Sequence, residues 1–216
     1  MKPRFFLFAV VWMLGLPASL QAQSAVKGEV VLPVKKSASA ASQRYSNIAG
    51  KVGVPKGKKG AVWLEGDFSG IERTESTEVE MGQTNFQFDD STIAIRVGTK
   101  VTFPNNDDAY HNVFSYSKAK RFDLGRYLKD ETPPAVLFDK PGVVKLYCEI
   151  HEHMRAVIVV VDSPFYVVTD TEGNFALKGV PAGSYTLKAW TGKRKLVEKQ
   201  VTLKDGETLA AGVLGE

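Results

Sequence analysis

Short apolar runs separated by turn-forming residues are the feature that most constrains how this chain folds. From Ser46 onward, apolar and β-branched runs alternate with Gly, Pro, Asn and Asp, and no stretch keeps a helical periodicity. Many short strands at such spacing are typical of β-sandwiches and barrels. The sequence therefore predicts an all-β protein.

The predicted strands extend almost to the end of the chain. They cover residues 47–52, 61–65, 77–81, 92–97, 100–103, 111–115, 135–138, 142–148, 156–161, 166–169, 174–177, 183–190 and 196–203. Domain boundaries are expected in the charged stretch 66–75 and at 162–164, where Pro164 follows a strand. The block between these boundaries contains every histidine and the only cysteine.

Residues 1–22 predict a secretory signal peptide. A short basic start precedes an apolar run over 5–16, and Leu20-Gln21-Ala22 suits signal peptidase. Residues 23–45 are interpreted as a linker, with at most a short edge strand at 28–33, because 35–43 is small and polar. No other stretch approaches the roughly 18 apolar residues of a membrane helix. We therefore expect a periplasmic protein without a membrane span.

The charge of the chain does not indicate a nucleic-acid partner. The formal net charge is +4, and removal of Lys2 and Arg4 with the signal peptide lowers it to +2. The lysine clusters are scattered among predicted strands and lack interleaved aromatic residues, so they are interpreted as solvated surface.

Cys148 is the single cysteine, which is unusual in an exported protein unless the thiol is protected or used. It begins a Cys-x2-His-x2-Met pattern with His151 and Met154 between two predicted strands, and His111 opens an earlier strand. Two imidazoles, a thiolate and an axial thioether are the ligands of a blue-copper site. Structural zinc favours more cysteines, and catalytic zinc keeps a position open for water. The pattern predicts copper, and binding would also explain the unpaired thiol.

Residues 76–161 resemble the plastocyanin and amicyanin family of cupredoxins, whose fold is a Greek-key β-barrel or sandwich. The segments that carry the resemblance are Val97–Asn105 (VGTKVTFPN), His111-Asn112-Val113, Pro141-Gly142 and Tyr147–Met154 (YCEIHEHM). In order and spacing they match the ligand pattern of the family, and the short loop is more similar to that of amicyanin.

The resemblance implies roles for further residues. The backbone N–H of Asn112 would donate to the cysteine sulfur, and Tyr147 would offer one route for electrons to leave. His151 would present its imidazole edge at the surface as the other route. Glu152 raises the alternative of a carboxylate ligand and a non-blue site. His153 is interpreted as an exposed loop residue, the alternative being a second metal-binding group or a pH-dependent contact.

The last third of the chain resembles the carboxypeptidase regulatory-like, transthyretin-like β-sandwich, which implies an accessory module without catalytic activity. The resemblance rests on residues 169–175 (TDTEGNF) and 179–185 (GVPAGSY), and its opening strand is visible at 60–64 (GAVWL). We interpret residues 46–72 and 162–216 as one unit into which the cupredoxin is inserted. Two successive domains, with 46–72 belonging to the cupredoxin, are the alternative.

The function expected from these patterns is that of a periplasmic carrier of single electrons between redox protein partners. Copper delivery or sequestration uses the same residues and remains an alternative, as does an accessory module of an envelope redox complex. We do not expect an enzyme, because no nucleophile motif or phosphate loop is present and such a copper site leaves no position for a substrate.

Overall fold

The computed structural model describes residues 24–33, 57–71, 78–131, 133–193 and 196–215. Within these ranges the regular elements are all strands, which confirms the predicted fold class. The same residues include no helix long and apolar enough to cross a membrane. The predicted signal peptide and the predicted strand at 47–52 lie outside the described residues.

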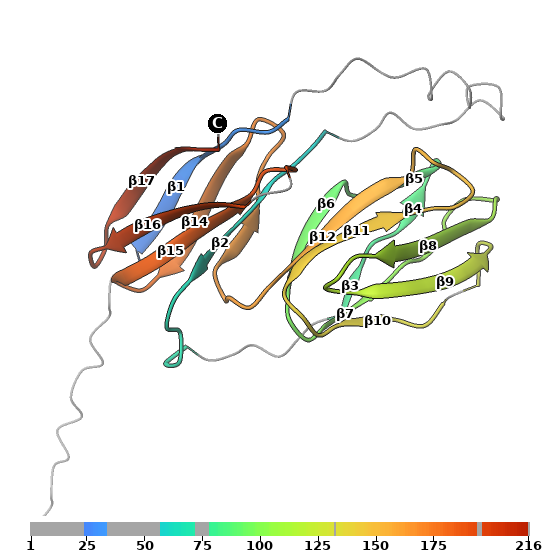
Figure 1. Cartoon of the computed structure of the whole chain (residues 1–216), viewed down its shortest axis with the longest axis horizontal. Helices are drawn as coiled ribbons and strands as arrows, with labels where there is room; N and C mark the ends of the chain where they lie inside the picture. Colours follow the sequence, from blue (N-terminus) through green and yellow to red (C-terminus); the bar gives the residue numbers. More distant parts are fainter. Residues whose placement is uncertain (1–23, 34–56, 72–77, 132, 194–195, 216) are drawn as a thin grey trace, which may run out of the picture.

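The middle of the chain forms a unit that we call the central sandwich, which lies at the right of Figure 1. Its strands are β3 (Glu78–Glu80), β4 (Gln83–Thr84), β5 (Gln87–Phe88), β6 (Thr92–Arg96), β7 (Thr99–Thr102), β8 (His111–Tyr116), β9 (Arg121–Tyr127), β10 (Val136–Phe138), β11 (Gly142–Tyr147) and β12 (Arg155–Val161). One sheet has the order β6-β12-β11-β8-β9, a second the order β10-β7-β3, and β4 and β5 form a hairpin. Alternate residues of both sheets supply one apolar core, as Val101 and Phe138 of one sheet and Val144 and Ile158 of the other illustrate.

Strands from both ends of the described chain form the flanking sandwich, at the left of Figure 1. They are β1 (Ser24–Val30), β2 (Ala61–Glu65), β13 (Tyr166–Val168), β14 (Asn174–Val180), β15 (Gly183–Trp190), β16 (Val197–Leu203) and β17 (Thr208–Leu214). The sheet orders are β14-β1-β17 and β13-β2-β15-β16. Since β2 lies between β13 and β15, strands that precede and follow the central sandwich in the sequence pair directly.

The linker predicted over 23–45, with an edge strand at 28–33, is wrong for the residues from Ser24 to Val30. These form β1, which lies in the centre of its sheet between β14 and β17. Val26 and Val30 alternate with exposed residues and are fully buried in the core of the flanking sandwich. Gly28 permits this position, because a Cβ there would lie 2.7 Å from the carbonyl oxygen of Gly212.

Four described strands, β4, β5, β9 and β17, were not predicted in any form. β9 carries charges and Gly125 in its sequence, which hid its alternation, and β4 and β5 are too short to give a periodic signal. The seven-residue β17, with the sequence TLAAGVL, was missed because its small residues resemble a loop. The remaining predicted strands within the described residues agree with the structure to within a few residues.

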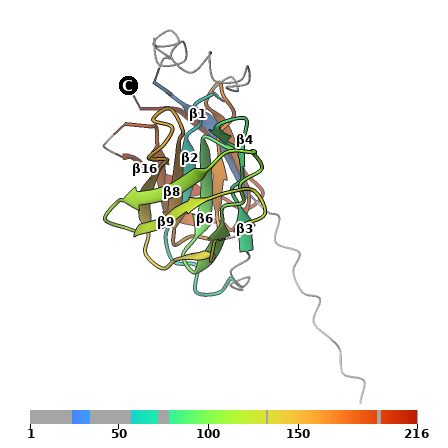
Figure 2. The ribbon, with the colours of Figure 1, turned by 90° about the vertical axis from the view of Figure 1, so that its right-hand side faces the viewer.

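A third apolar cluster joins the two sandwiches. Trp63 of β2 and Trp190 of β15 are buried against Val159 and Val161 of β12. The flanking sandwich therefore covers the outer face of the five-stranded sheet near β6 and β12. The strands β8 and β9 lie farther from it, at the front in Figure 2.

Candidate metal centre

The predicted ligands lie on one strand and one tight loop of the central sandwich. His111 is the first residue of β8, and the loop from Cys148 to Met154 joins β11 to β12, whose pairing continues up to Tyr147 opposite Arg155. Within the loop the Met154 N–H donates to the His151 carbonyl at 2.9 Å, and the Cys148 N–H donates to the Met154 carbonyl at 3.4 Å. These bonds close the loop into one turn beside β8.

The structure brings three of the predicted ligands together. Nδ1 of His111 lies 3.2 Å from Nδ1 of His151, and Sγ of Cys148 lies 3.7 Å from the same His151 nitrogen. The donor atoms of these three residues all lie within 4.8 Å of one another. His111 is 0% exposed, Cys148 4% and His151 8%. The arrangement is a buried cluster of two imidazoles and one thiol, the donor set that suits copper.

Asp107 fixes the orientation of His111. Its Oδ2 lies 2.8 Å from Nε2 of His111, so a neutral imidazole donates its Nε2 proton to the carboxylate and keeps the Nδ1 lone pair directed at the cluster. Asp107 was not among the residues predicted from the sequence. Its i, i+4 spacing from His111 was the available signal, but the two residues lie outside any helix.

The surroundings of Cys148 lower the pKa of its thiol. Burial opposes the charged form, but hydrogen bonds with His111 and His151 and from the backbone N–H groups of Asn112 and His151 outweigh it and lower the pKa to about 5. Burial also opposes protonation of His111, whereas Cys148 and Asp107 raise its pKa above the ordinary value. The lowered pKa favours the thiolate, the form that binds a metal.

Asn112 and Tyr147 lie beside the cluster. The backbone N–H of Asn112 is among the groups that lower the pKa of Cys148. The Asn112 side chain donates to Asp123 at 2.7 Å and accepts the Glu149 N–H at 3.3 Å, which ties the loop to β9. Tyr147 is half-buried and its ring centroid lies 5.7 Å from that of Phe114.

Met154 is the fourth predicted ligand and is fully buried in the core that also contains Cys148. It lies at the end of the loop, next to β12. Met81, a second methionine of the same core, is 1% exposed. Glu152 is exposed. Among the described residues, the buried group of possible metal ligands consists of His111, Cys148 and His151 and does not include Glu152.

Phe86 covers the imidazoles and was missed by the sequence analysis. Its ring meets that of His151 edge to face at 5.0 Å between centroids and that of His111 at 5.7 Å. The turn between β4 and β5 has a φ of 54° at Asn85 and 59° at Phe86. A positive φ is unusual for a bulky side chain, so contacts from elsewhere must hold this turn.

Two residues hold the turn in place. Asp107 accepts the backbone N–H groups of Asn85 at 2.7 Å and of Phe86 at 2.8 Å. His153 donates from Nε2 to the Phe86 carbonyl at 2.9 Å. The turn is therefore connected both to the residue that orients His111 and to the ligand loop.

One expectation about the loop histidines is wrong. His153 is half-buried rather than exposed, because it reaches across to Phe86, and burial lowers its pKa. His151 is 8% exposed, and the Phe86 ring lies edge to face against its imidazole.

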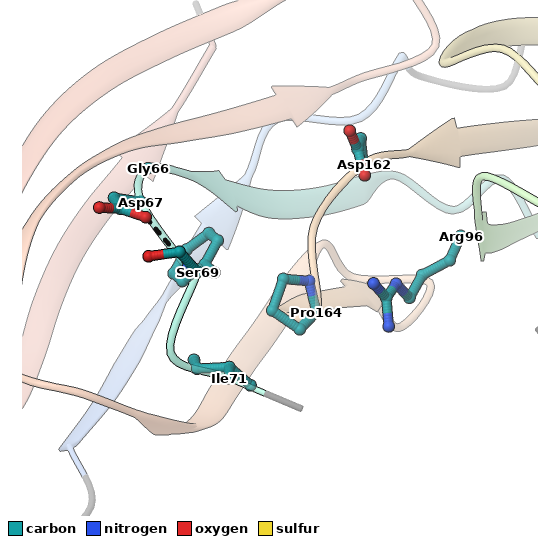
Figure 3. A pocket seen from close by; sticks show the side chains of 8 residues that line it. Gly66, Asp67, Ser69, Ile71, Arg96, Asp162 and Pro164 are labelled. Carbon is teal, nitrogen blue, oxygen red and sulfur yellow. Dashed lines mark hydrogen bonds between the residues drawn. The ribbon is translucent and has the colours of Figure 1, made fainter. Parts of the chain in front are cut away.

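A cavity of about 230 Å³ at the junction of the two sandwiches is distinct from this cluster. Asp67 and Ser69 border it after β2, Arg96 at the end of β6 and Asp162 after β12 (Figure 3). Its lining residues share no member with the cluster of histidines and cysteine.

Comparison with known proteins identifies the class of the central sandwich. Residues 75–161 match the family of copper binding proteins described as the plastocyanin/azurin family. This segment, which is less than half of the chain, is a copper-binding cupredoxin domain. Together with the cluster of His111, Cys148 and His151, the match identifies copper as its cofactor.

Several solved structures are similar to the same region. Amicyanin from Paracoccus versutus is 21% identical with a TM-score of 0.36, and the match covers 43% of this chain and 88% of amicyanin. A purple cupredoxin from Nitrosopumilus maritimus is 23% identical with a TM-score of 0.34, and the match covers 40% of this chain and 100% of that protein. A copper-containing nitrite reductase from Thermus scotoductus is 24% identical with a TM-score of 0.36, over 42% of this chain and only 23% of the reductase. No curated protein matches the chain.

Proposed function

We propose that this protein carries single electrons between redox protein partners at a type 1 copper centre held by His111, Cys148, His151 and Met154. The observation that carries the proposal is the buried convergence of the two Nδ1 atoms on a thiol whose pKa is lowered to about 5. Copper bound there supplies a one-electron change between Cu(I) and Cu(II). The residues of the chain supply the donor atoms, exclude water and hold the geometry.

Met154 is proposed as the axial ligand from the chemistry of its thioether and its place in the chain. It is fully buried, and its backbone is hydrogen-bonded to both His151 and Cys148 within the ligand loop. A thioether is a weak axial donor in His2Cys copper sites.

Rigidity of the ligand frame supports electron transfer over catalysis. Asp107 restrains His111, and Asn112 connects its strand with both β9 and the residue after Cys148. A frame tied in this way reorganises little when the charge of the site changes. The covering Phe86 ring also leaves little room for a substrate, so we propose that the protein is not an enzyme.

Copper delivery is the second candidate, and the burial of the donor atoms argues against it. Rapid exchange requires that an incoming ligand reach the metal, whereas all three donor residues are at most 8% exposed. Slow loss of Cu(I) to an excess of chelator supports the electron carrier, and loss within seconds supports delivery.

The proposal includes an exported location and an accessory role for the flanking sandwich. The amino-terminal sequence supports export to the periplasm. The sandwich formed by β1, β2 and β13–β17 is proposed as a carboxypeptidase regulatory-like module without catalytic activity.

Copper titration of the purified protein tests the proposal. We expect one equivalent of Cu(II) to produce an intense visible band from sulfur-to-copper charge transfer and a reversible one-electron couple. Cys148→Ser abolishes the band, whereas the control Ser115→Ala, at another buried position of the same sandwich, retains it. A colourless wild-type complex would refute the proposal.

A further inference from the structure

The edge strand β9 departs from regular pairing next to the ligand loop. It lies beside β8 at the end of the five-stranded sheet, at the front in Figure 2. Asn112 of β8 lies opposite Arg126, and Phe114 lies opposite Asp123, so β9 uses one residue more than β8 between these pairs. The extra residue forms a β-bulge, for which Gly125 supplies a positive φ of 69°. A bulge bends its strand and re-aims the side chains around it, which here contact Asn112 and the ligand loop.

The carboxylate of Asp123 joins this bulge to the side chain of Asn112. Its Oδ1 accepts hydrogen bonds from the Gly125 N–H at 3.0 Å and from Nδ2 of Asn112 at 2.7 Å. The same Nδ2 also donates to the Gly125 carbonyl at 3.1 Å. Because both acceptors face the NH2 group, the amide oxygen of Asn112 must point to the opposite side.

That amide oxygen reaches the cysteine end of the ligand loop. Oδ1 of Asn112 accepts the backbone N–H of Glu149, the residue that follows Cys148, at 3.3 Å. Asn112 is 1% exposed, so water replaces this contact poorly. The main chain next to Cys148 is therefore held by Asn112, whose own orientation depends on Asp123.

Glu149 has a second contact, which comes from β9. Its Oε1 lies 2.6 Å from Nε of Arg126. Arg126 is 63% exposed and Glu149 47%, so this ion pair contributes little to stability, but it restricts the direction of the Glu149 side chain. Glu149 is thus held by β8 through its main chain and by β9 through its side chain, and Asp123 joins these two strands.

We infer that Asp123 is a positioning residue of the copper centre, which acts through Asn112 on the main chain at Glu149 and so sets the direction in which Cys148 presents its sulfur. The inference rests on the proposed copper centre and adds to it a side chain outside the ligand set. An Asp123 with a structural role only would stabilise the edge strand and leave the site unchanged. The two roles differ in what happens at Glu149 and at the copper when the carboxylate is lost.

Three variants separate these roles. Asp123→Ala removes both hydrogen bonds of Oδ1, whereas Asp123→Asn keeps an oxygen that can accept both. Asp170→Ala is the matched control in the flanking sandwich. Asp170 accepts the Glu172 N–H at 3.1 Å and Nδ2 of Asn174 at 2.9 Å, which are bonds of the same kinds in a sandwich without a predicted ligand.

Amide hydrogen exchange of the ¹⁵N-labelled apo protein measures the contact at Glu149 without copper. In Asp123→Ala the Glu149 N–H should exchange about threefold to tenfold faster than in wild type, because the amide oxygen of Asn112 is no longer held in place. Asp123→Asn and Asp170→Ala should remain within about twofold of wild type at this amide.

Spectra of the Cu(II) protein and affinity for Cu(I) measure the effect on the centre. Asp123→Ala should move the sulfur-to-copper charge-transfer band and change the copper hyperfine splitting in electron spin resonance, since both depend on the direction of the Cys148 sulfur. Its Cu(I) affinity, measured by competition with a chelator, should fall about threefold to tenfold, less than the roughly 10- to 100-fold typical of partners that bond a ligand directly. Asp123→Asn should restore all three values, and Asp170→Ala should leave them unchanged.

A second substitution serves if Asp123→Ala does not fold. Asp123→Ser keeps a short acceptor for the N–H of Gly125, two residues ahead, but its side chain cannot reach Nδ2 of Asn112. It should show the same faster exchange at Glu149 and the same spectral change.

Loss of stability alone does not support the inference. Wild-type exchange at Glu149, or a wild-type spectrum, in a folded variant that lacks the Asn112 contact would overturn it. An equal change in Asp170→Ala, or failure of Asp123→Asn to restore the values, would overturn it as well. A wild-type protein with no visible copper band contradicts the proposed function instead, and the exchange of the Glu149 amide in the apo variants then still decides whether Asp123 holds the ligand loop.

Discussion

Replacing Asp107 by asparagine removes the acceptor that orients His111. Oδ1 of Asp107 accepts the Asn85 N–H, and Oδ2 accepts both the Phe86 N–H and Nε2–H of His111, at 2.7, 2.8 and 2.8 Å. Asparagine has only one acceptor oxygen, so its NH2 group must face at least one of these donors. When the NH2 group faces Nε2 of His111, it favours the imidazole tautomer that carries its proton on Nδ1. That nitrogen is the one that would otherwise bind copper.

The expected losses follow from the number of bonds broken. The Asp107 side chain is 11% exposed, so water replaces the lost acceptor poorly. One or two charge-assisted hydrogen bonds at about 1.5–3 kcal/mol each predict that Asp107→Asn lowers the free energy of unfolding of the apo protein by about 1.5–6 kcal/mol. Copper affinity should fall by about 10- to 100-fold, the usual effect of losing a partner of a metal-bound histidine.

The pH dependence has a definite sign. Burial raises the pKa of Asp107, but hydrogen bonds from Phe86, His111 and Asn85 outweigh it and hold the pKa below the ordinary value. Its contribution is therefore complete above about pH 4 and is lost as the pH falls through the lowered pKa. The stability difference between wild type and Asp107→Asn should shrink in acid.

Urea unfolding of the apo proteins and competition with a chromophoric Cu(I) chelator measure the two losses. Asp108→Asn is the matched control, because this neighbouring carboxylate is 95% exposed with Lys129 at 3.8 Å, and its loss should cost less than about 1 kcal/mol. Equal stability and equal copper affinity in Asp107→Asn and wild type would refute the role assigned to Asp107.

Three further predictions concern single groups. The Cys148 thiol of the folded apo protein should titrate with a pKa of about 5 when its ultraviolet thiolate absorbance is followed, whereas the unfolded chain in urea should give about 8.5. The stabilisation that the thiolate contributes to the fold is therefore lost as the pH falls from about 8.5 to 5. Equal titration midpoints in the folded and unfolded states would contradict this. Met154→Leu should keep copper binding and shift the reduction potential, whereas Met81→Leu in the same core should leave the potential unchanged, and equal potentials for all three proteins would exclude Met154 as a ligand. Gly28→Ala should destabilise the protein by about 1–3 kcal/mol, since a Cβ there would lie 2.7 Å from a backbone oxygen, whereas Gly70→Ala meets nothing within 4 Å, and equal unfolding midpoints would contradict the placement of β1.

The ligand set was accessible from the sequence because its chemistry is local. Cys148, His151 and Met154 lie within seven residues between two strands, and the order of soft and borderline donors is specific for copper. His111 lies 37 residues before Cys148 in the sequence and was joined to the set because it opens another predicted strand, and the resemblance then gave it a place in the ligand order.

The covering turn was not predictable in the same way. Phe86 reaches the imidazoles from a strand pair of only two residues each, and its contacts with Asp107 and His153 join segments 21 and 67 residues apart in the sequence. β1 was missed for a similar reason, because its burial depends on pairing with β14 and β17 at the other end of the chain. Contacts of this kind leave no periodic signal.

X-ray absorption at the copper edge, recorded on the Cu(I) and the Cu(II) protein, tests the central claim most directly. The account predicts one short bond to sulfur and two bonds to imidazole nitrogen in both states, with little change in length on oxidation. A spectrum without the sulfur ligand, or a water oxygen bound on oxidation, would contradict it.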